Sequence, residues 1–232
     1  MDLASVLMVA SVAGLFALRG LNTLLPETAR GRSDEAPLRG FSPKSGQISQ
    51  QEFWALVTSG HRIGIADAPV TIVVFSDYAC GFCIELNRTL EILLSRYPQH
   101  LAVVVKLLTD LSSSTRFNVA LGAECAAEQG WFREYHNAAL GAGELIEYST
   151  GWQQIAEAAG IPNALAFLDC VRSRRLEEAL RHDDEDAVRL GVRVTPTLFV
   201  NRDRVVGSAP LAVLDSIISS AFSGRRTSRA QH

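Results

Sequence analysis

The chain has 232 residues, 47% apolar and 20% charged, which is ordinary for a globular protein of one sizeable domain with an appendage. A formal net charge of -3 gives no support to a nucleic-acid-binding function, which requires a clustered basic face. Four cysteines are too few for a scaffold built from disulfides.

The N-terminus carries an apolar run that bears on location. Residues 3–18 are apolar apart from two serines, and Arg19 ends the run. This is short for a membrane-spanning helix, which needs roughly 17–25 residues, unless Arg19 snorkels toward the headgroups and the following leucines extend the run. A cleaved signal peptide would begin with a basic residue, but Asp2 stands there. We therefore expect an uncleaved signal anchor at residues 1–25 rather than a core helix.

The orientation of that anchor is open. Arg19, Arg30 and Arg32 follow the apolar run. By the positive-inside rule these charges would leave the rest of the chain in the cytoplasm. A basic leader encoded upstream of Met1 would reverse that argument. We expect the folded part to lie outside the cytoplasm, in the periplasm or on the outer surface.

Residues 26–47 are rich in Pro, Gly, Ser, Arg and Glu without a hydrophobic period, which predicts a flexible linker. Ser49 and Glu52 then have the spacing of a capping box. The apolar residues that follow predict a short amphipathic helix that ends at Gly60.

A strand–helix–strand unit follows. Residues 70–75 are β-branched and apolar throughout, as expected for a strand covered on both faces. A helix is predicted from residue 80 to about Arg96, and a second apolar strand over residues 101–108. This order implies a parallel pair of strands joined by a crossover helix.

The next third of the chain, residues 112–190, reads as helical throughout. Five helices are expected, the first capped by Ser113 or Ser114 and the last running from Leu176 to Leu190. The acidic residues 183–186 in the last helix are expected to be a solvated surface.

The C-terminal segment returns to strands. Residues 197–201 and 205–206 flank Arg202-Asp203-Arg204, which predicts a hairpin, and a last helix is expected from Pro210. The chain has no internal repeat. Alternation of strands and helices therefore predicts an α/β fold with a helical subdomain.

Cys80 and Cys83 form the sharpest chemical signal, a C-x-x-C where a predicted strand gives way to a predicted helix. The first sulfur then lies at the helix N-terminus, where free N–H groups and the dipole stabilise a thiolate, the nucleophilic form. The second sulfur falls one turn later and can form a disulfide or resolve a mixed one. A structural disulfide is the main alternative. Zinc would need two further ligands at matching spacing, which are lacking, so no metal and no cofactor is expected.

Thr195-Pro196 is the second signal. Proline cannot donate a ladder hydrogen bond, so its place at the start of an apolar strand is unusual. A cis bond there would place the Thr195 backbone beside an active site, free to bind an extended substrate. An ordinary trans proline at a strand start is the alternative that base rates favour.

Three segments together carry a family resemblance. They read FSDYACGFC (75–83), CAAEQGWFREYH (125–136) and GVRVTPT (191–197), and they resemble the DsbA-type branch of the thioredoxin superfamily. The resemblance covers roughly residues 66–222. It implies a thioredoxin-like α/β fold over residues 48–111 and 191–224, interrupted by a helical insertion at residues 112–190.

The same resemblance implies roles for four residues. Cys80 would be the nucleophile, Cys83 the resolving thiol, and Thr195-Pro196 the cis-proline element beside them. The implied activity is donating, or sometimes shuffling, disulfides in exported proteins.

The sequence departs from the family at two places. Gly81-Phe82 replaces the Pro-His of the best-known strong oxidants, which leaves the redox potential open. Val74 stands six residues before the first cysteine, where thioredoxins and many relatives carry a buried acid. The proton of the Cys83 thiol must then be exchanged with another group or with water. Asp77 and Glu85 are nearest in sequence, although a surface or capping role is the simpler expectation for both.

Two further pairs of residues in the expected insertion are assigned structural roles. Cys125 and Cys170 are expected to form a structural disulfide that braces it, two buried thiols being the alternative. His136 and Trp131 are interpreted as packing residues of the insertion rather than active-site residues.

Three functions stay open. The first is an enzyme that oxidises cysteine-containing exported proteins, with a possible integral-membrane redox partner. The second is a reductase or isomerase on the same fold, and the third is a non-catalytic binding module. A monomer is expected, because isomerases of this kind dimerise through an added domain and residues 33–60 are too short for one.

Overall fold

The computed structural model describes residues 46–229, with side chains as far as residue 221. The expected anchor at residues 1–25 and all but the last two residues of the expected linker lie outside the described residues. Within residues 46–229, no helix combines the length and the apolar character needed to cross a membrane.

A five-stranded mixed sheet forms the centre of the fold, with the strand order β1-β3-β2-β4-β5. β2 and β3 are parallel, whereas all other neighbours are antiparallel. The strands are β1 (His61–Gly64), β2 (Val70–Ser76), β3 (Leu101–Leu107), β4 (Thr197–Val200) and β5 (Asp203–Val206). The parallel pair and the C-terminal hairpin therefore form as the sequence predicts.

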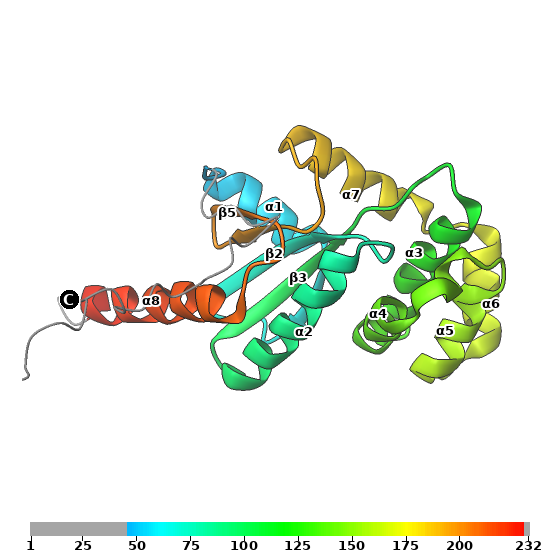
Figure 1. Ribbon diagram of the computed structural model, residues 1–232, viewed down its shortest axis with the longest axis horizontal. Coiled ribbons are helices and arrows are strands. Elements are labelled where there is room, and N and C mark those ends of the chain that lie inside the picture. The colour runs from blue at the N-terminus through cyan, green and yellow to red at the C-terminus, as the bar shows by residue number, and fades with distance from the viewer. Residues whose placement is uncertain (1–45, 230–232) are drawn as a thin grey trace, which may run out of the picture. The chain divides into compact units, whose positions relative to one another are not determined.

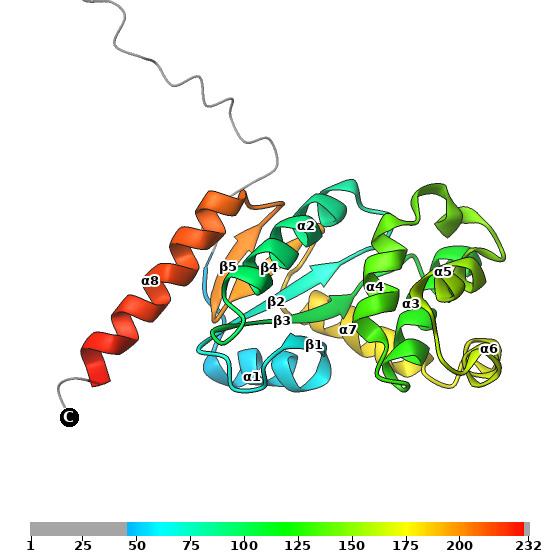
Figure 2. The ribbon, with the colours of Figure 1, turned by 90° about the horizontal axis from the view of Figure 1, so that it is seen from below.

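Helices cover both faces of the sheet (Figures 1 and 2). The flanking helices are α1 (Gln50–Ser59), α2 (Gly81–Arg96), α7 (Glu177–Arg189) and α8 (Leu211–Arg229). On the face under α2 and α8, Val74 and Val105 pack with leucines of those helices. On the face under α1 and α7, Val73 and Phe75 pack with Phe53 and neighbouring apolar side chains. Since successive side chains of β2 alternate between two covered faces, all seven of its residues are buried.

Helices of the insertion lie between β3 and β4 in the chain, and all of them except α7, which covers a face of the sheet, gather beside one end of the strands (Figure 2). They are α3 (Ser114–Ala127), α4 (Phe132–Gly141), the short 3-10 helix η1 (Gly143–Glu147), α5 (Gly151–Ala159), α6 (Ala164–Ser173) and α7. Ser113 caps α3, as expected. α2 contacts α4, so the insertion packs directly on the helix that begins with the C-x-x-C.

The structure differs from the sequence-based expectation in three local features. Strand β1 was not expected, because His61 and Arg62 interrupt any apolar pattern; it is an edge strand defined by its pairing with β3. The 3-10 helix η1 was also not expected. The hairpin turn lies at Asn201 and Arg202, earlier than predicted, and Asn201 takes the left-handed conformation that asparagine tolerates (φ 53°).

Candidate active site

Cys80 is the N-cap residue of α2, directly after the turn that leaves β2. The turn is held by Asp77, whose Oδ1 accepts a hydrogen bond from the Ala79 N–H at 2.8 Å. The Cys80 N–H donates to the Asp77 carbonyl at 3.1 Å. The Cys80 side chain is half-buried and its thiol is free. Cys80 therefore lies at the positive end of the α2 dipole, where negative charge on its sulfur is favoured.

Cys83 lies one turn further along α2 and is only 2% exposed. Burial raises the pKa of its thiol to about 12, and contacts with the Asp77 N–H and the Ser76 hydroxyl offset part of that effect. A substrate can therefore reach Cys80, whereas Cys83 is buried behind it in protonated form. This asymmetry is what a nucleophile with a resolving partner requires.

The loop before β4 completes the site. The Thr195–Pro196 peptide bond is cis. The Cys80 thiol donates a hydrogen bond to the Thr195 carbonyl oxygen, with 3.3 Å between sulfur and oxygen. Thus the structure brings together Cys80, Cys83, Thr195 and Pro196 from two distant parts of the chain. Two apolar side chains, Phe82 (52% exposed) and Val194 (53% exposed), extend from the same two segments.

The groups that could exchange a proton with Cys83 are few. Val74 is buried and apolar, so this position supplies no acid. Asp77 caps the turn, and burial raises the pKa of its carboxyl. Glu85 is exposed on α2. The capping and surface roles expected for Asp77 and Glu85 therefore describe them well.

Cys125 and Cys170 form a disulfide that joins α3 to α6, with their Cα atoms 5.9 Å apart. Both side chains are buried in the insertion. This disulfide is therefore separate from the free dithiol of Cys80 and Cys83.

His136 is buried, as its packing interpretation requires, whereas Trp131 is partly exposed at the surface. His136 is 2% exposed, and its Nδ1 lies 3.1 Å from the hydroxyl of Tyr78, in the turn before Cys80. Trp131 precedes α4 and is 37% exposed, because the helix begins after it. Sequence reasoning missed the Tyr78–His136 contact, since it joins residues far apart in the chain.

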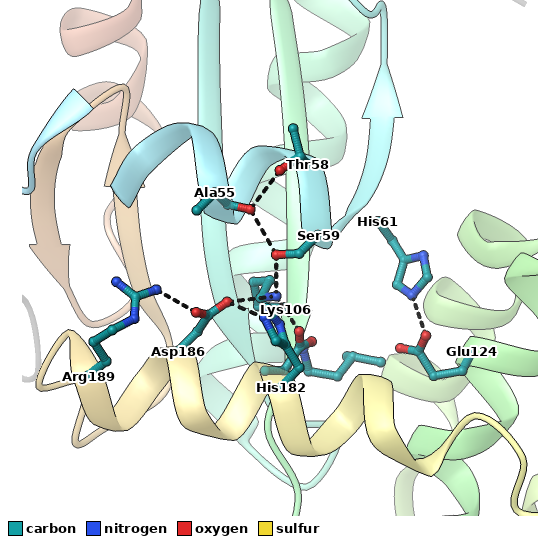
Figure 3. Close-up of polar contacts among 11 residues, drawn as sticks. Ala55, Thr58, Ser59, His61, Lys106, Glu124, His182, Asp186 and Arg189 are labelled. Atoms are coloured by element: carbon teal, nitrogen blue, oxygen red, sulfur yellow. Dashed lines mark hydrogen bonds and ion pairs between the residues drawn. The ribbon is translucent and has the colours of Figure 1, made fainter. Parts of the chain in front are cut away.

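A second buried polar cluster lies on the opposite face of the sheet (Figure 3). Lys106 of β3 is fully buried and forms ion pairs with Asp183 and Asp186 of α7, and its ammonium donates to Ser59 at 2.9 Å. The expectation that the acidic run is solvated is therefore wrong for Asp183 and Asp186, which are 4% and 5% exposed. Helical spacing turns these two toward the sheet, where Lys106 supplies the compensating charge.

His182, Asp183 and Asp186 place three potential metal-ligand atoms within 4.8 Å of one another. However, the Lys106 ammonium contacts both carboxylates. The cation that this cluster needs is thus provided by the protein, and the arrangement does not point to a metal site.

Comparison with known proteins places this geometry in context. A family model described as Thioredoxin matches residues 57–220. A periplasmic thioredoxin-like protein from Salmonella enterica serovar Typhimurium is 22% identical, with a TM-score of 0.63 over 77% of this chain and 99% of that chain. A thioredoxin-like oxidoreductase from Silicibacter pomeroyi DSS-3 is 21% identical, with a TM-score of 0.66 over 76% and 99%. The thiol-disulfide exchange protein alpha-DsbA2 from Wolbachia pipientis is 20% identical, with a TM-score of 0.62 over 74% and 94%.

At these identities the solved structures show the fold, and the predicted thioredoxin-like fold with a helical insertion is confirmed. Parts of curated proteins are also similar. Na+/H+ antiporter NhaA 1 of Salinispora arenicola is 31% identical over 172 residues, which are 72% of this chain and 25% of that protein. NhaA 1 of Mycolicibacterium gilvum is 29% identical over 167 residues, 71% and 26% respectively. The chain spans about a quarter of the length of these relatives.

Proposed function

Because the chain belongs to the thioredoxin family, we propose that it is a protein thiol–disulfide oxidoreductase that donates disulfides to exported, cysteine-containing proteins through Cys80 and Cys83. One observation carries the proposal. Cys80 is accessible at the N-terminus of α2, and its sulfur faces the Thr195 carbonyl, while Cys83 is buried one turn behind it. The names of the structural relatives agree with this class of enzyme.

The exchange follows from the geometry. In the oxidised protein, a substrate thiolate attacks the Cys80 sulfur, the bond between the two sulfurs breaks, and Cys83 leaves with the electron pair and takes up a proton. A second substrate thiolate then attacks the substrate sulfur of the mixed disulfide and releases Cys80 as a thiolate. The substrate gains a disulfide, and the cysteine pair holds two electrons and is ready for reoxidation.

The Thr195 segment and the helix N-terminus have separate parts in this scheme. The N–H groups of the first turn of α2 favour negative charge on the departing Cys80 sulfur, which supports the donor direction. The loop at Thr195 lies against Cys80 and provides backbone beside which an extended substrate can lie. Phe82 and Val194 give this surface an apolar border.

The location outside the cytoplasm has independent support. The Cys125–Cys170 disulfide lies in the insertion, away from the dithiol, and structural disulfides persist mainly in oxidising compartments. We propose an extracytoplasmic, membrane-associated protein that acts as a monomer. The Cys80–Cys83 pair would be reoxidised by an integral-membrane redox partner.

The test is the redox potential of the Cys80–Cys83 pair, measured on the full chain in glutathione buffers. We expect a value of about −120 mV, as for a disulfide donor whose reduced form is stabilised. A value of about −270 mV would mark a reductant instead. Cys80→Ser should abolish exchange, and full biological activity of that variant would favour a non-catalytic binding module. Cys125→Ser with Cys170→Ser is the matched control and should leave the potential unchanged.

A further inference from the structure

A small cavity lies behind Cys83, between α2, the sheet and α4. Its polar lining residues are Ser76, Cys83, Asn87, Glu91 and His136, and the rest of its wall is apolar. The centre of a water molecule has about 10 Å³ available there. A single buried water occupies roughly 10–15 Å³ and needs two to four polar partners. The cavity thus has room for one water molecule beside the buried thiol.

The hydrogen bond with Tyr78 determines which ring nitrogen of His136 carries the proton. Tyr78 is buried, and burial raises the pKa of its phenol well above 10, so it keeps its proton. His136 is neutral, because burial, assisted by His61, lowers its pKa to about 3. A buried phenol needs an acceptor for its O–H, and Nδ1 of His136 lies 3.1 Å away. If Tyr78 donates to Nδ1, the imidazole proton is on Nε2.

Nε2 of His136 has no hydrogen-bond partner among the residues that the structure describes, while His136 lines the cavity together with Cys83. We propose that His136 is a positioning residue for Cys83: its Nε2–H holds a water molecule in this cavity, and that water donates a hydrogen bond to the Cys83 thiolate. The inference rests on the proposed thiol–disulfide exchange. His136 would then be a neutral partner for Cys83 in a site where Val74 occupies the position of a buried acid.

The charged groups around this cavity are paired with other residues. Glu91, on its α2 side, forms an ion pair with Arg133 at 2.5 Å. Glu124 of α3 pairs with His61 of β1 at 2.9 Å (Figure 3). Glu91 and Glu124 each have a partner outside the cavity, and the Asn87 amide donates to Asn137 at 2.9 Å, which leaves His136 as the neutral donor for a water beside Cys83.

Asp77 and Cys80 approach Cys83 from the turn before α2. The Asp77 carboxylate accepts the Ala79 N–H, and the Cys80 thiol donates to the Thr195 carbonyl. The Asp77 carboxylate is thus engaged elsewhere, and the contact that the Cys80 thiol also makes with Cys83 raises the pKa of Cys83 rather than stabilising its thiolate. A positioned water is therefore the remaining means of stabilising a thiolate on Cys83, beyond the Ser76 hydroxyl and the Asp77 N–H.

The step affected is the one in which Cys83 carries negative charge. When a substrate thiolate opens the disulfide, Cys83 leaves as a thiolate; when Cys83 resolves a mixed disulfide, it loses its proton to solvent and attacks the Cys80 sulfur. In both directions the water stabilises the charge on sulfur, while His136 stays neutral and transfers no proton. A thiol with a lower pKa is a better leaving group. Because the water contacts only the Cys83 sulfur, it affects only the steps in which Cys83 leaves or attacks.

The test separates the two thiols in one experiment on the reduced full chain. With Ellman's reagent, attack by Cys80 releases one nitrothiobenzoate, and attack by Cys83 on the resulting mixed disulfide releases the second. In stopped-flow mixing at neutral pH, His136→Leu should slow the second phase about tenfold, the effect of losing one hydrogen bond to a charged group, and leave the first unchanged. The rate of the second phase should rise with pH in both proteins, with the midpoint displaced upward in the variant.

Two further variants make the outcome decisive. His136→Gln keeps an N–H donor at this position and should recover most of the second-phase rate. Glu134→Gln, on the exposed side of the same helix, is the matched control and should change neither phase. Equal slowing of both phases, or an unchanged second phase in His136→Leu, would overturn the inference. Release of fewer than two equivalents of nitrothiobenzoate by the unmodified protein would instead contradict the proposed exchange itself.

Discussion

The two faces of the central sheet differ in the charge and pairing of their buried polar groups. On the α7 face, Lys106 is surrounded by two carboxylates and the Ser59 hydroxyl. On the α2 face, Tyr78 and His136 form one neutral pair beside a small cavity and the Cys83 thiol.

The pairing of the buried groups determines which face can respond to a change of charge. A charge cluster in which every member is held by several partners cannot gain or lose a proton without losing an ion pair, so it acts as a structural clamp. A neutral hydrogen-bonded pair beside a space for water can respond when a nearby sulfur changes its charge. Asp183 on one face and His136 on the other have pKa values shifted in opposite directions, so their contributions to stability should change with pH in opposite senses, and substitutions of each should show it.

The largest effect is expected from His136→Gln. The pKa of His136 is lowered from 6.5 to about 3 in the folded protein. Between these values the unfolded chain binds a proton that the folded protein does not, so stability is lost as pH falls. This difference in pKa corresponds to roughly 5 kcal/mol of unfolding free energy over the whole window, which the variant should not lose. Urea unfolding across this pH window measures it, and parallel curves for the two proteins would contradict the expectation.

Lys106→Met should destabilise the protein by about 3–5 kcal/mol, because it leaves Asp183 and Asp186 buried without their shared cation. The control is Arg189→Met: Arg189 also pairs with Asp186, but its side chain is 44% exposed, and a change of about 1 kcal/mol or less is expected. Chemical unfolding at neutral pH compares the two. Similar losses in both variants would mean that burial does not distinguish these pairs.

Asp183→Asn tests the opposite pH dependence. Burial raises the pKa of Asp183 from 3.8 to about 6, despite its contact with Lys106. Between these values the folded protein binds a proton that the unfolded chain has released, so stability falls as pH rises. Relative to the unmodified protein, the variant should gain up to about 3 kcal/mol from the acidic to the neutral end of this window. A constant difference across the window would disprove that assignment.

The smallest effect is expected from Tyr78→Phe, which leaves Nδ1 of His136 without its donor and should cost about 1–3 kcal/mol of unfolding free energy. Adding His136→Leu removes both partners and should recover part of the loss. A double-mutant cycle measures the coupling. Strict additivity of the two substitutions would mean that the pair contributes nothing.

Much of the fold could be predicted from the sequence where local signals were strong. The β-branched run of β2, the capping box at Ser49 and the helix after Cys80 each follow from short-range chemistry. Strand β1 could not be predicted, because only its pairing with β3 makes His61–Gly64 a strand. The same limit applies to side chains whose partners are distant in the chain.

The candidate site divides in the same way. Cys80 and Cys83 are visible in sequence because their spacing matches one helical turn. The partner of His136 is not visible in the sequence, because Tyr78 lies on a different element. The burial of Asp183 and Asp186 is not visible either, because the compensating Lys106 is on β3. Long-range pairing of polar groups needs the three-dimensional structure.

The sheet topology also bears on how the protein is made. β2, α2 and β3 follow one another in the chain, whereas β4 reaches β2 only through pairs such as Ile72 with Val200. During synthesis the earlier segments emerge and fold first, and closing the long loop to β4 comes later. Cys80 and Cys83 are thus available to each other before Cys125 and Cys170 have been added to the chain. This order of synthesis favours the correct pairing of four cysteines in the newly made protein.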